Sequence, residues 1–280
     1  MIFYFSGTGN TRFVAEQIAA GIGEETVFIP DAIREGKFEF EVNADETVGF
    51  CFPTHGWQVP GIVRGFIRRL RLIRPPLAPP TQEGNWDCYC WAVTTCGDNM
   101  GEAMTILNKE LAANVQLAAN DAQKCCGRPL QTSAVFSVIM PESYVCLPFM
   151  HTDPEEKEQR KIAEARRQLP HIIDCIRERR EGVEELEKGA TPRLYSYVIG
   201  GYFNKRMITD RKFTVDDDVC IKCGKCQKVC PVDNITGTPP EWIHNGRCTS
   251  CLACYHYCPV HAINFGRITR KRGQYYFKER

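Results

Sequence analysis

Short apolar runs alternate with amphipathic stretches along the first half of the chain. The runs predict four buried strands, at residues 2–5, 47–52, 86–95 and 134–140. Between them, apolar side chains recur at three- and four-residue spacing and predict helices at residues 61–72 and 100–115. Strands that alternate with helices are typical of a doubly wound parallel sheet, so the pattern predicts the α/β fold class.

The pattern changes to a long charged stretch and then to an apolar one. Residues 154–187 keep apolar positions at helical spacing and predict a helix that completes the first domain, with a kink or restart at Pro170. Residues 189–212 carry an apolar stripe and a weak point at Gly200 and Gly201. The stripe comprises Leu194, Tyr195, Val198, Ile199, Tyr202 and Phe203. We interpret the segment as a linker helix whose stripe packs between two domains; a helix lying on a membrane is the alternative.

The length and the apolar runs also limit the organisation and location of the protein. A chain of 280 residues is long enough for two domains. No uncharged apolar run is long enough to cross a bilayer, and the first residues lack the pattern of a secretory leader. We therefore expect a cytoplasmic protein without a membrane span, whose cysteines serve metals or redox chemistry rather than structural disulfides.

Eight of the sixteen cysteines fall in two copies of one spacing, C-x2-C-x2-C-x3-C-P. The first copy is Cys220, Cys223, Cys226 and Cys230, and the second is Cys248, Cys251, Cys254 and Cys258. Three cysteines at two-residue intervals let one loop wrap three irons of a cubane cluster, so the fourth thiolate must come from elsewhere. The doubled run matches the signature of bacterial ferredoxins with two 4Fe-4S clusters. Structural zinc, which prefers two separated C-x2-C pairs, is the alternative.

In the ferredoxins that this run resembles, the fourth cysteine of each copy binds the other cluster. The resemblance therefore implies a crossed assignment of ligands. Cluster I takes Cys220, Cys223, Cys226 and Cys258, and cluster II takes Cys248, Cys251, Cys254 and Cys230. We interpret the basic residues from Arg267 to Arg280 as compensation for cluster charge and as a surface for redox partner proteins, in preference to nucleic acid.

A glycine-rich turn follows the first predicted strand and precedes an amphipathic helix. It consists of Ser6, Gly7, Thr8, Gly9, Asn10 and Thr11. Glycines let the backbone wrap an anion, while hydroxyls and the amides at the helix start donate hydrogen bonds to it. The turn lacks the lysine of a Walker loop and the third glycine of a dinucleotide fingerprint. It matches the flavodoxin phosphate loop, and this resemblance implies FMN; a merely structural turn is the alternative.

In a flavodoxin-like sheet, ligands bind beyond the carboxyl ends of the strands. We therefore expect the segments after the strands predicted at residues 47–52 and 86–95 to meet the flavin ring. These segments are Pro53, Thr54, His55, Gly56 and Trp57, and Thr94, Thr95, Cys96, Gly97, Asp98 and Asn99. The loop after the strand predicted at residues 134–140 adds Tyr144. Trp57 is the expected stacking partner, and ordinary packing is the alternative for both aromatic side chains.

The whole chain resembles the flavodoxin-ferredoxin fusion family of anaerobic bacteria and archaea, also called EFR-type ferredoxins. The phosphate loop, residues 140–144 and the eight cysteines carry the resemblance. It implies sheet order 2-1-3-4-5, a flavodoxin-like domain at 1–188, a linker helix at 189–212 and a ferredoxin domain at 213–280. The implied function is electron transfer between FMN, two 4Fe-4S clusters and external redox partner proteins. The alternatives are a flavin-dependent reductase fed by its own clusters and an interaction module without flavin.

Overall fold

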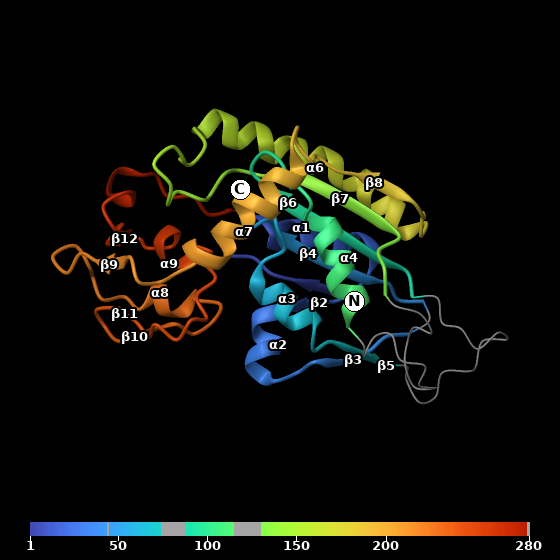
Figure 1. Cartoon of the computed structure of the whole chain (residues 1–280), viewed down its shortest axis with the longest axis horizontal. Helices are drawn as coiled ribbons and strands as arrows, with labels where there is room; N and C mark the ends of the chain where they lie inside the picture. The colour runs from blue at the N-terminus through green and yellow to red at the C-terminus, as the bar shows by residue number, and fades with distance from the viewer. Residues whose placement is uncertain (44, 74–87, 115–129, 279–280) are drawn as a thin grey trace.

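A six-stranded parallel sheet forms the centre of the molecule (Figure 1). The computed structural model describes residues 1–43, 45–73, 88–114 and 130–278. The sheet has the order β2-β1-β4-β6-β7-β8. Its strands are β1 (Ile2–Tyr4), β2 (Thr26–Phe28), β4 (Val48–Pro53), β6 (Cys90–Cys96), β7 (Ala134–Ile139) and β8 (Val183–Glu185). The first five strands follow the flavodoxin-like order, so the predicted fold class is confirmed, and β8 extends the sheet beyond β7.

Helices cover both faces of the sheet, and each face has its own apolar core. On one face lie α1 (Asn10–Ile22) and α6 (Glu155–Arg177), packed against Ile2 and Tyr4 of β1. On the other face lie α2 (Ile29–Glu35), α3 (Gly61–Ile67) and α4 (Ala103–Ala113), packed against Phe3 and Phe5. Successive side chains of a strand point to opposite faces, so an almost wholly apolar strand serves both cores.

Several predicted element boundaries differ from the structure. The helix predicted at 61–72 ends at Ile67, and β5 (Arg71–Ile73) pairs with β3 (Glu39–Glu41) instead of continuing it. The strand predicted at 86–95 begins at Cys90, while residues 86 and 87 lie outside the described residues, as does residue 115 of the helix predicted at 100–115. The apolar runs located the strands correctly, but short apolar stretches do not separate helix from strand.

The charged stretch at 154–187 contains a helix and a strand. The α6 helix continues through Pro170 and ends at Arg177, so the predicted restart is wrong, and β8 follows it. Pro170 lies on the exposed side of the helix. Water can satisfy the carbonyl that loses its partner to the proline there, which lowers the cost of keeping the helix intact.

Gly49 of β4 leaves room for a large aromatic side chain on the neighbouring strand. A Cβ at this position would overlap the indole ring of Trp91, whose Cε2 would lie 2.6 Å away. Trp91 is fully buried and donates its indole N–H to Thr47 Oγ1, so the ring has little freedom to move. We expect Gly49→Ala to lower the free energy of unfolding by about 1–3 kcal/mol. Chemical denaturation measures this loss; an unchanged midpoint would contradict the tight packing.

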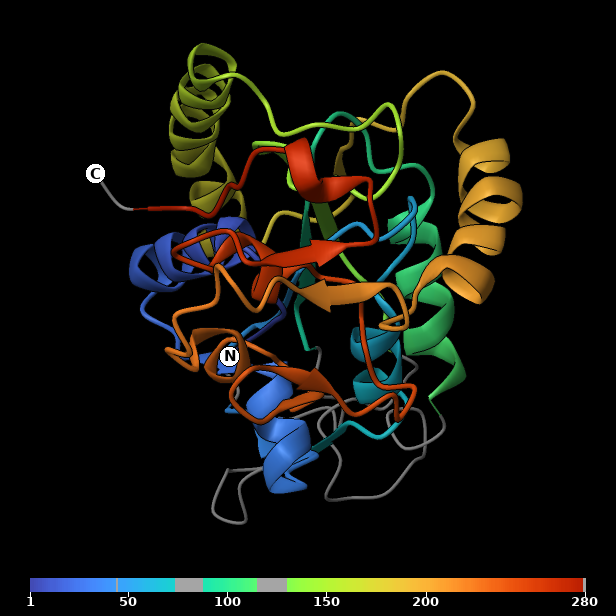
Figure 2. The same ribbon diagram turned by 90° about the vertical axis from the view of Figure 1, so that its left-hand side faces the viewer.

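The C-terminal part forms a small α+β unit beside the carboxyl ends of the large sheet's strands (Figure 2). It has two antiparallel pairs, β9 (Phe213–Val215) with β12 (Ile263–Phe265), and β10 (Ile235–Thr236) with β11 (Glu241–Trp242). Its short helices are α8 (Lys225–Lys228), α9 (Ala253–His256) and a 3-10 turn at Thr269–Lys271. A separate apolar core, which includes Tyr255 and Ile263, supports this ferredoxin-like unit.

A helical segment from Leu194 to Met207, which we call the strap helix, crosses the front of the molecule. It joins a π-helical stretch (Leu194–Ile199), α7 (Gly200–Tyr202) and a second π-helical stretch (Phe203–Met207) without a break at Gly200. We predicted that the apolar stripe of this segment packs between two domains. This prediction is wrong for all of its residues except Phe203, which is buried. Leu194, Tyr195, Val198, Ile199 and Tyr202 are exposed. Among the described residues, no helix is long and apolar enough to cross a membrane.

Candidate functional site: two cysteine cavities and a loop cavity

The eight motif cysteines line two separate cavities. The first cysteine cavity contains Cys220, Cys223, Cys226 and Cys258. The second cysteine cavity contains Cys230, Cys248, Cys251 and Cys254. Each cavity therefore takes three cysteines from one motif and the last cysteine of the other. This division is the one that the crossed assignment requires, and it arises because α8 and α9 lie side by side and each ends just before the crossing cysteine.

The chemistry of the second cysteine cavity fits an iron-sulfur cluster. Burial raises the pKa of Cys248 to about 12 and also raises the pKa of Cys251, so a thiolate there needs a positive charge close by. Iron bound to the sulfur atoms supplies that charge. Within the described ranges, no three His, Cys, Asp or Glu side chains are grouped to hold a single metal ion.

Backbone amides already point at several of the cysteine sulfurs. Asn234 N–H donates to Cys230 Sγ at 3.3 Å, and Ala262 N–H donates to Cys258 Sγ at 3.2 Å. Each of these amides follows its crossing cysteine by four residues, so the two halves of the unit repeat the same local geometry. Hydrogen bonds to cluster sulfurs stabilise the reduced, more negative state, because they place positive dipoles beside the added charge.

Trp242, which lies between the two cysteine motifs, and His256, which lies within the second motif, have different surroundings. Trp242 lines the second cysteine cavity and stacks on Phe213, with ring centroids 5.3 Å apart, so it shields this cavity from water. His256 is buried and contacts backbone groups through both ring nitrogens. Its Nε2 lies 2.6 Å from the carbonyl oxygen of Ser143, and its Nδ1 accepts from the Tyr275 amide. His256 thus ties the loop after β7 to the ferredoxin-like unit.

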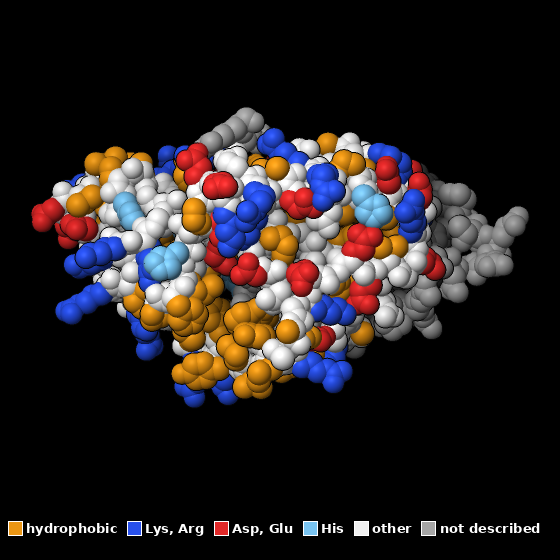
Figure 3. Space-filling view, turned by 90° about the horizontal axis from the view of Figure 1, so that it is seen from above, with side chains coloured by type: hydrophobic (Ala, Val, Ile, Leu, Met, Phe, Trp, Pro, Cys, Tyr) orange, Lys and Arg blue, Asp and Glu red, His pale blue; other side chains and the backbone are white. Residues whose placement is uncertain are grey.

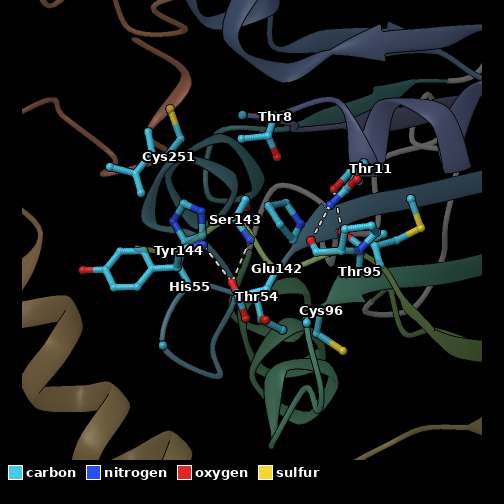
Figure 4. A pocket seen from close by; sticks show the side chains of 18 of the residues that line it. Thr8, Thr11, Thr54, His55, Thr95, Cys96, Glu142, Ser143, Tyr144 and Cys251 are labelled. Atoms are coloured by element: carbon cyan, nitrogen blue, oxygen red, sulfur yellow. Dashed lines mark hydrogen bonds between the residues drawn. The ribbon is translucent and has the colours of Figure 1, made fainter. Parts of the chain in front are cut away.

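A third cavity, the loop cavity, lies at the carboxyl ends of β1, β4, β6 and β7 (Figure 4). Sixteen of the eighteen residues expected at the FMN site line it, namely Ser6, Gly7, Thr8, Asn10, Thr11, Pro53, Thr54, His55, Gly56, Trp57, Thr95, Cys96, Gly97, Asp98, Asn99 and Tyr144. The other two predicted residues, Gly9 and Thr94, do not line the cavity. Gly9 donates its amide to Ser6 Oγ, and Thr94 is fully buried with its hydroxyl donating to the Phe52 carbonyl.

The glycine-rich turn and the start of α1 offer uncapped backbone amides that can bind an anion. Gly9 adopts a left-handed conformation (φ 96°) immediately before α1, which a residue with a side chain rarely adopts. No side chain of the described residues caps α1, and its first turn contains no acidic residue. Uncapped amides and the positive end of the helix dipole favour a phosphate group at this point. The loop cavity therefore fits FMN at its phosphate end.

The opposite side of the loop cavity combines aromatic side chains with two buried titratable groups. Trp57 packs against Tyr195 of the strap helix, and Tyr144 packs against Phe203. Burial lowers the pKa of His55 to about 4, so its imidazole is neutral at physiological pH. Burial also raises the pKa of Glu142, although this carboxylate accepts hydrogen bonds from the amides of Ser143 and Tyr144.

The loop cavity and the second cysteine cavity share three consecutive residues, Ser250, Cys251 and Leu252, of which Cys251 is a motif cysteine. It lines both cavities, and Figure 4 shows it on a loop of the ferredoxin-like unit at the edge of the loop cavity. Contact with the glycine-rich turn is tight. A Cβ at Gly7 would lie 2.7 Å from Cys251 Cβ and 2.8 Å from the Cys251 carbonyl oxygen. Only glycine permits this approach at position 7.

The end of the chain fastens the ferredoxin-like unit to the glycine-rich turn. The Phe277 amide donates to the Thr8 carbonyl at 2.8 Å, and the Tyr275 hydroxyl donates to Asn10 Oδ1 at 2.6 Å. The Phe277 ring stacks on Phe13 of α1 with centroids 4.4 Å apart. Residues expected to form a basic surface therefore continue into a segment without regular secondary structure that buries two aromatic side chains against the first domain.

Sequence reasoning missed the part of the loop cavity that distant segments build. These residues are Leu147, Met150, Phe203, Ser250, Cys251 and Leu252. The rule that ligands meet the carboxyl ends of the strands located the loops of the sheet itself. Contributions from the strap helix and the ferredoxin-like unit have no comparable local signal, and Cys251 was predicted only as a cluster ligand.

A buried ion pair supports the loop after β7. Asp153 accepts hydrogen bonds from Lys161 Nζ at 2.6 Å and from the Glu142 amide at 2.9 Å, and both charged side chains are almost fully buried. Asp153→Asn leaves the Lys161 charge without its partner, so we expect the free energy of unfolding to fall by about 3 kcal/mol at neutral pH. Asp174→Asn on the exposed side of α6 is the matched control and is expected to change it by about 0.5 kcal/mol or less.

The effect of Asp153 depends on pH in a defined direction. Burial raises the pKa of this carboxyl, but the hydrogen bonds from Lys157, Lys161 and the Glu142 amide outweigh it, and the net pKa is lowered from 3.8. The unfolded chain therefore takes up the proton first as pH falls, which favours unfolding. The advantage of the wild type over Asp153→Asn is expected to be constant above pH 3.8 and to shrink below it; an advantage that grows on acidification would contradict this.

Comparison with known proteins supports part of this picture. Residues 212–259 match the 4Fe-4S dicluster domain family. The C-terminal part of the chain is therefore an iron-sulfur domain of the kind that transfers electrons. The chain is also similar to the solved structure of Trp repressor binding protein from Bacillus subtilis, at 15% identity over 60% of this chain and 95% of that chain (TM-score 0.32). It is similar to azoreductase AzrA at 12% identity over 61% and 98% (TM-score 0.31).

Proposed function

We propose that this protein is an electron carrier in which one FMN and two 4Fe-4S clusters exchange electrons with each other and with external redox partner proteins. The first domain, residues 1–188, holds FMN in the loop cavity, residues 189–212 form a linker that contains the strap helix, and residues 213–280 hold the clusters. Cys220, Cys223, Cys226 and Cys258 bind cluster I, and Cys248, Cys251, Cys254 and Cys230 bind cluster II. FMN supplies chemistry with one or two electrons, while each cluster accepts one.

The observation that carries this proposal is that Cys251 lines both the second cysteine cavity and the loop cavity. A ligand of cluster II that also lines the loop cavity puts the cluster beside the flavin with no other side chain required between them. The two clusters are adjacent because each motif contributes to both cysteine cavities. The arrangement supports a linear order from FMN to cluster II and then to cluster I. At the far end, Cys223 is exposed, which suits exchange with an external protein.

The chain's own residues have distinct roles in this proposal. The hydroxyls of Ser6 and Thr8 and the amides at the start of α1 bind the phosphate. Trp57 and Tyr144 exclude water from the ring side, and the strap helix supports them through Tyr195 and Phe203. Neutral His55 adds no charge beside the flavin, and burial raises the pKa of the Glu142 carboxyl.

Anaerobic purification followed by quantification of iron, sulfide and FMN tests the cofactor content. One flavin with two clusters per chain is expected. Rapid mixing with a one-electron reductant then tests exchange: cluster bleaching should be followed by flavin reduction at a rate independent of protein concentration. Failure of the protein to take up FMN on reconstitution would contradict the proposed role as a flavin-containing electron carrier. Steady turnover of a small acceptor without any partner protein would instead favour the flavin-dependent reductase.

A further inference from the structure

The strap helix is amphipathic, but its polar side faces the protein and its apolar side faces outward, which is the opposite of an ordinary surface helix. Its inward side consists mainly of small or polar residues that touch backbone. Ser196 donates its hydroxyl to the Trp57 carbonyl, and Asn204 donates its amide to the His55 carbonyl. At Gly200 the helix crosses the Gly56 carbonyl so closely that a Cβ would overlap it. Hydrogen bonds and close backbone contact therefore hold the helix in place, and its apolar side chains take little part in the core.

The outward side of the strap helix presents a continuous apolar surface. It consists of Leu194, Tyr195, Tyr197, Val198, Ile199 and Tyr202, with Val198 62% and Tyr202 64% exposed. Figure 3 shows hydrophobic side chains gathered at the lower edge of the view, where this helix lies. Figure 2 shows that the helix is the outermost element on its side of the molecule. Exposed apolar patches of this kind mark interaction surfaces. Because this patch is convex, it fits a flat or deformable partner better than a partner that offers a pocket.

The charges around this surface indicate what covers it. Residues 189–212 contain five basic residues and one acidic residue, Asp210, which is buried. Arg193 lies before the apolar residues, and Lys205 and Arg206 lie after them; all three are exposed, and none forms an ion pair with any described residue. Lys109 adds a fourth cation over the Tyr197 ring. Figure 3 shows Lys and Arg side chains at both ends of the patch.

We propose that the strap helix binds an anionic lipid surface and lies in the interface plane. Apolar residues enter the boundary between headgroups and acyl chains, tyrosines occupy the headgroup level, and the unpaired cations contact lipid phosphates. At about 21 Å the helix is too short to span a bilayer and has a length suited to lying on one. A second copy of this chain fits less well, because two such faces would bring cations together.

Co-flotation of the anaerobically purified holoprotein with lipid vesicles tests this proposal. Binding is expected to vesicles of phosphatidylcholine mixed with phosphatidylserine, to weaken as salt rises, and to be marginal for phosphatidylcholine alone. Lys205→Glu with Arg206→Glu is expected to weaken binding by about tenfold or more. Leu194→Asp with Val198→Asp removes the apolar contact and is expected to abolish it. Iron content, flavin content and circular dichroism verify that each variant is folded.

A matched charge reversal distinguishes the strap helix from general basicity. Arg267 and Arg270 are exposed cations outside the strap helix, and Arg267→Glu with Arg270→Glu should keep most of the vesicle binding. Equal loss in this control would overturn the proposal, as would absence of binding to anionic vesicles at low salt. Light scattering of the free protein provides a further test. A dimer that the Leu194→Asp, Val198→Asp variant dissociates would assign the face to self-association and also overturn the proposal.

Discussion

Replacing two cysteines at once is expected to remove either one cluster or both, depending on which pair is chosen. Cys226→Ala with Cys258→Ala alters only the first cysteine cavity, so about half of the iron and sulfide should remain. Cys226→Ala with Cys230→Ala alters both cavities, so nearly all of it should be lost. Iron analysis and anaerobic electron paramagnetic resonance of the reduced protein provide the measurement.

The two pairs make the crossed assignment testable against its alternative. If each motif held its own cluster, the outcomes would be reversed, and the Cys226, Cys230 pair would retain half of the iron. Cys146→Ala is the matched control, because Cys146 is a buried cysteine of the same apolar core that lines neither cysteine cavity. Its iron content should equal that of the wild type. Loss of iron in this control would mean that cavity lining does not identify the ligands.

A single methyl group at Gly7 is expected to disturb both cofactors. Gly7→Ala places a Cβ within 2.8 Å of the Cys251 backbone and side chain, so the turn and the cysteine loop must separate. Overpacking of this kind costs about 1–3 kcal/mol. If this overpacking destabilises the FMN-bound protein but not the FMN-free protein, the dissociation constant for FMN rises by about ten- to a hundredfold. Flavin fluorescence titration of the reconstituted protein measures this change, and rapid mixing should show slower exchange between flavin and clusters.

Gly65→Ala is the control for the Gly7 substitution. Gly65 lies on the exposed side of α3, and a Cβ there meets no described atom within 4 Å. Alanine is the better helix former, so this variant should be more stable by about 0.5–1 kcal/mol with unchanged affinity for FMN. Wild-type affinity and exchange rate in Gly7→Ala would show that the turn and Cys251 are not in functional contact, which would remove the main support for the proposed electron route.

The sequence determined the features that rest on local pattern. Apolar runs at residues 2–5, 47–52 and 134–140 located strands, because a strand buried on both faces needs apolar residues at every position. The glycine-rich turn predicted the loop cavity, because the conformation of such a turn depends on consecutive residues. The resemblance of the doubled cysteine run to bacterial ferredoxins implied the division of the cysteines. Residues 71–73 and 183–185 were assigned to helices because three-residue strands carry too little periodicity to be recognised.

Only the tertiary structure decided which distant surfaces meet and which remain open. Nothing near Cys251 in the sequence indicates that it would contact Gly7, because the contact depends on how the ferredoxin-like unit packs against the glycine-rich turn. The apolar stripe of residues 194–203 predicted burial, yet Ser196 and Gly200 bind the backbone of the first domain and turn the stripe outward. Amphipathic periodicity shows that a helix has two different sides, but the direction that each side faces depends on hydrogen bonds and close contacts to residues far away in the chain.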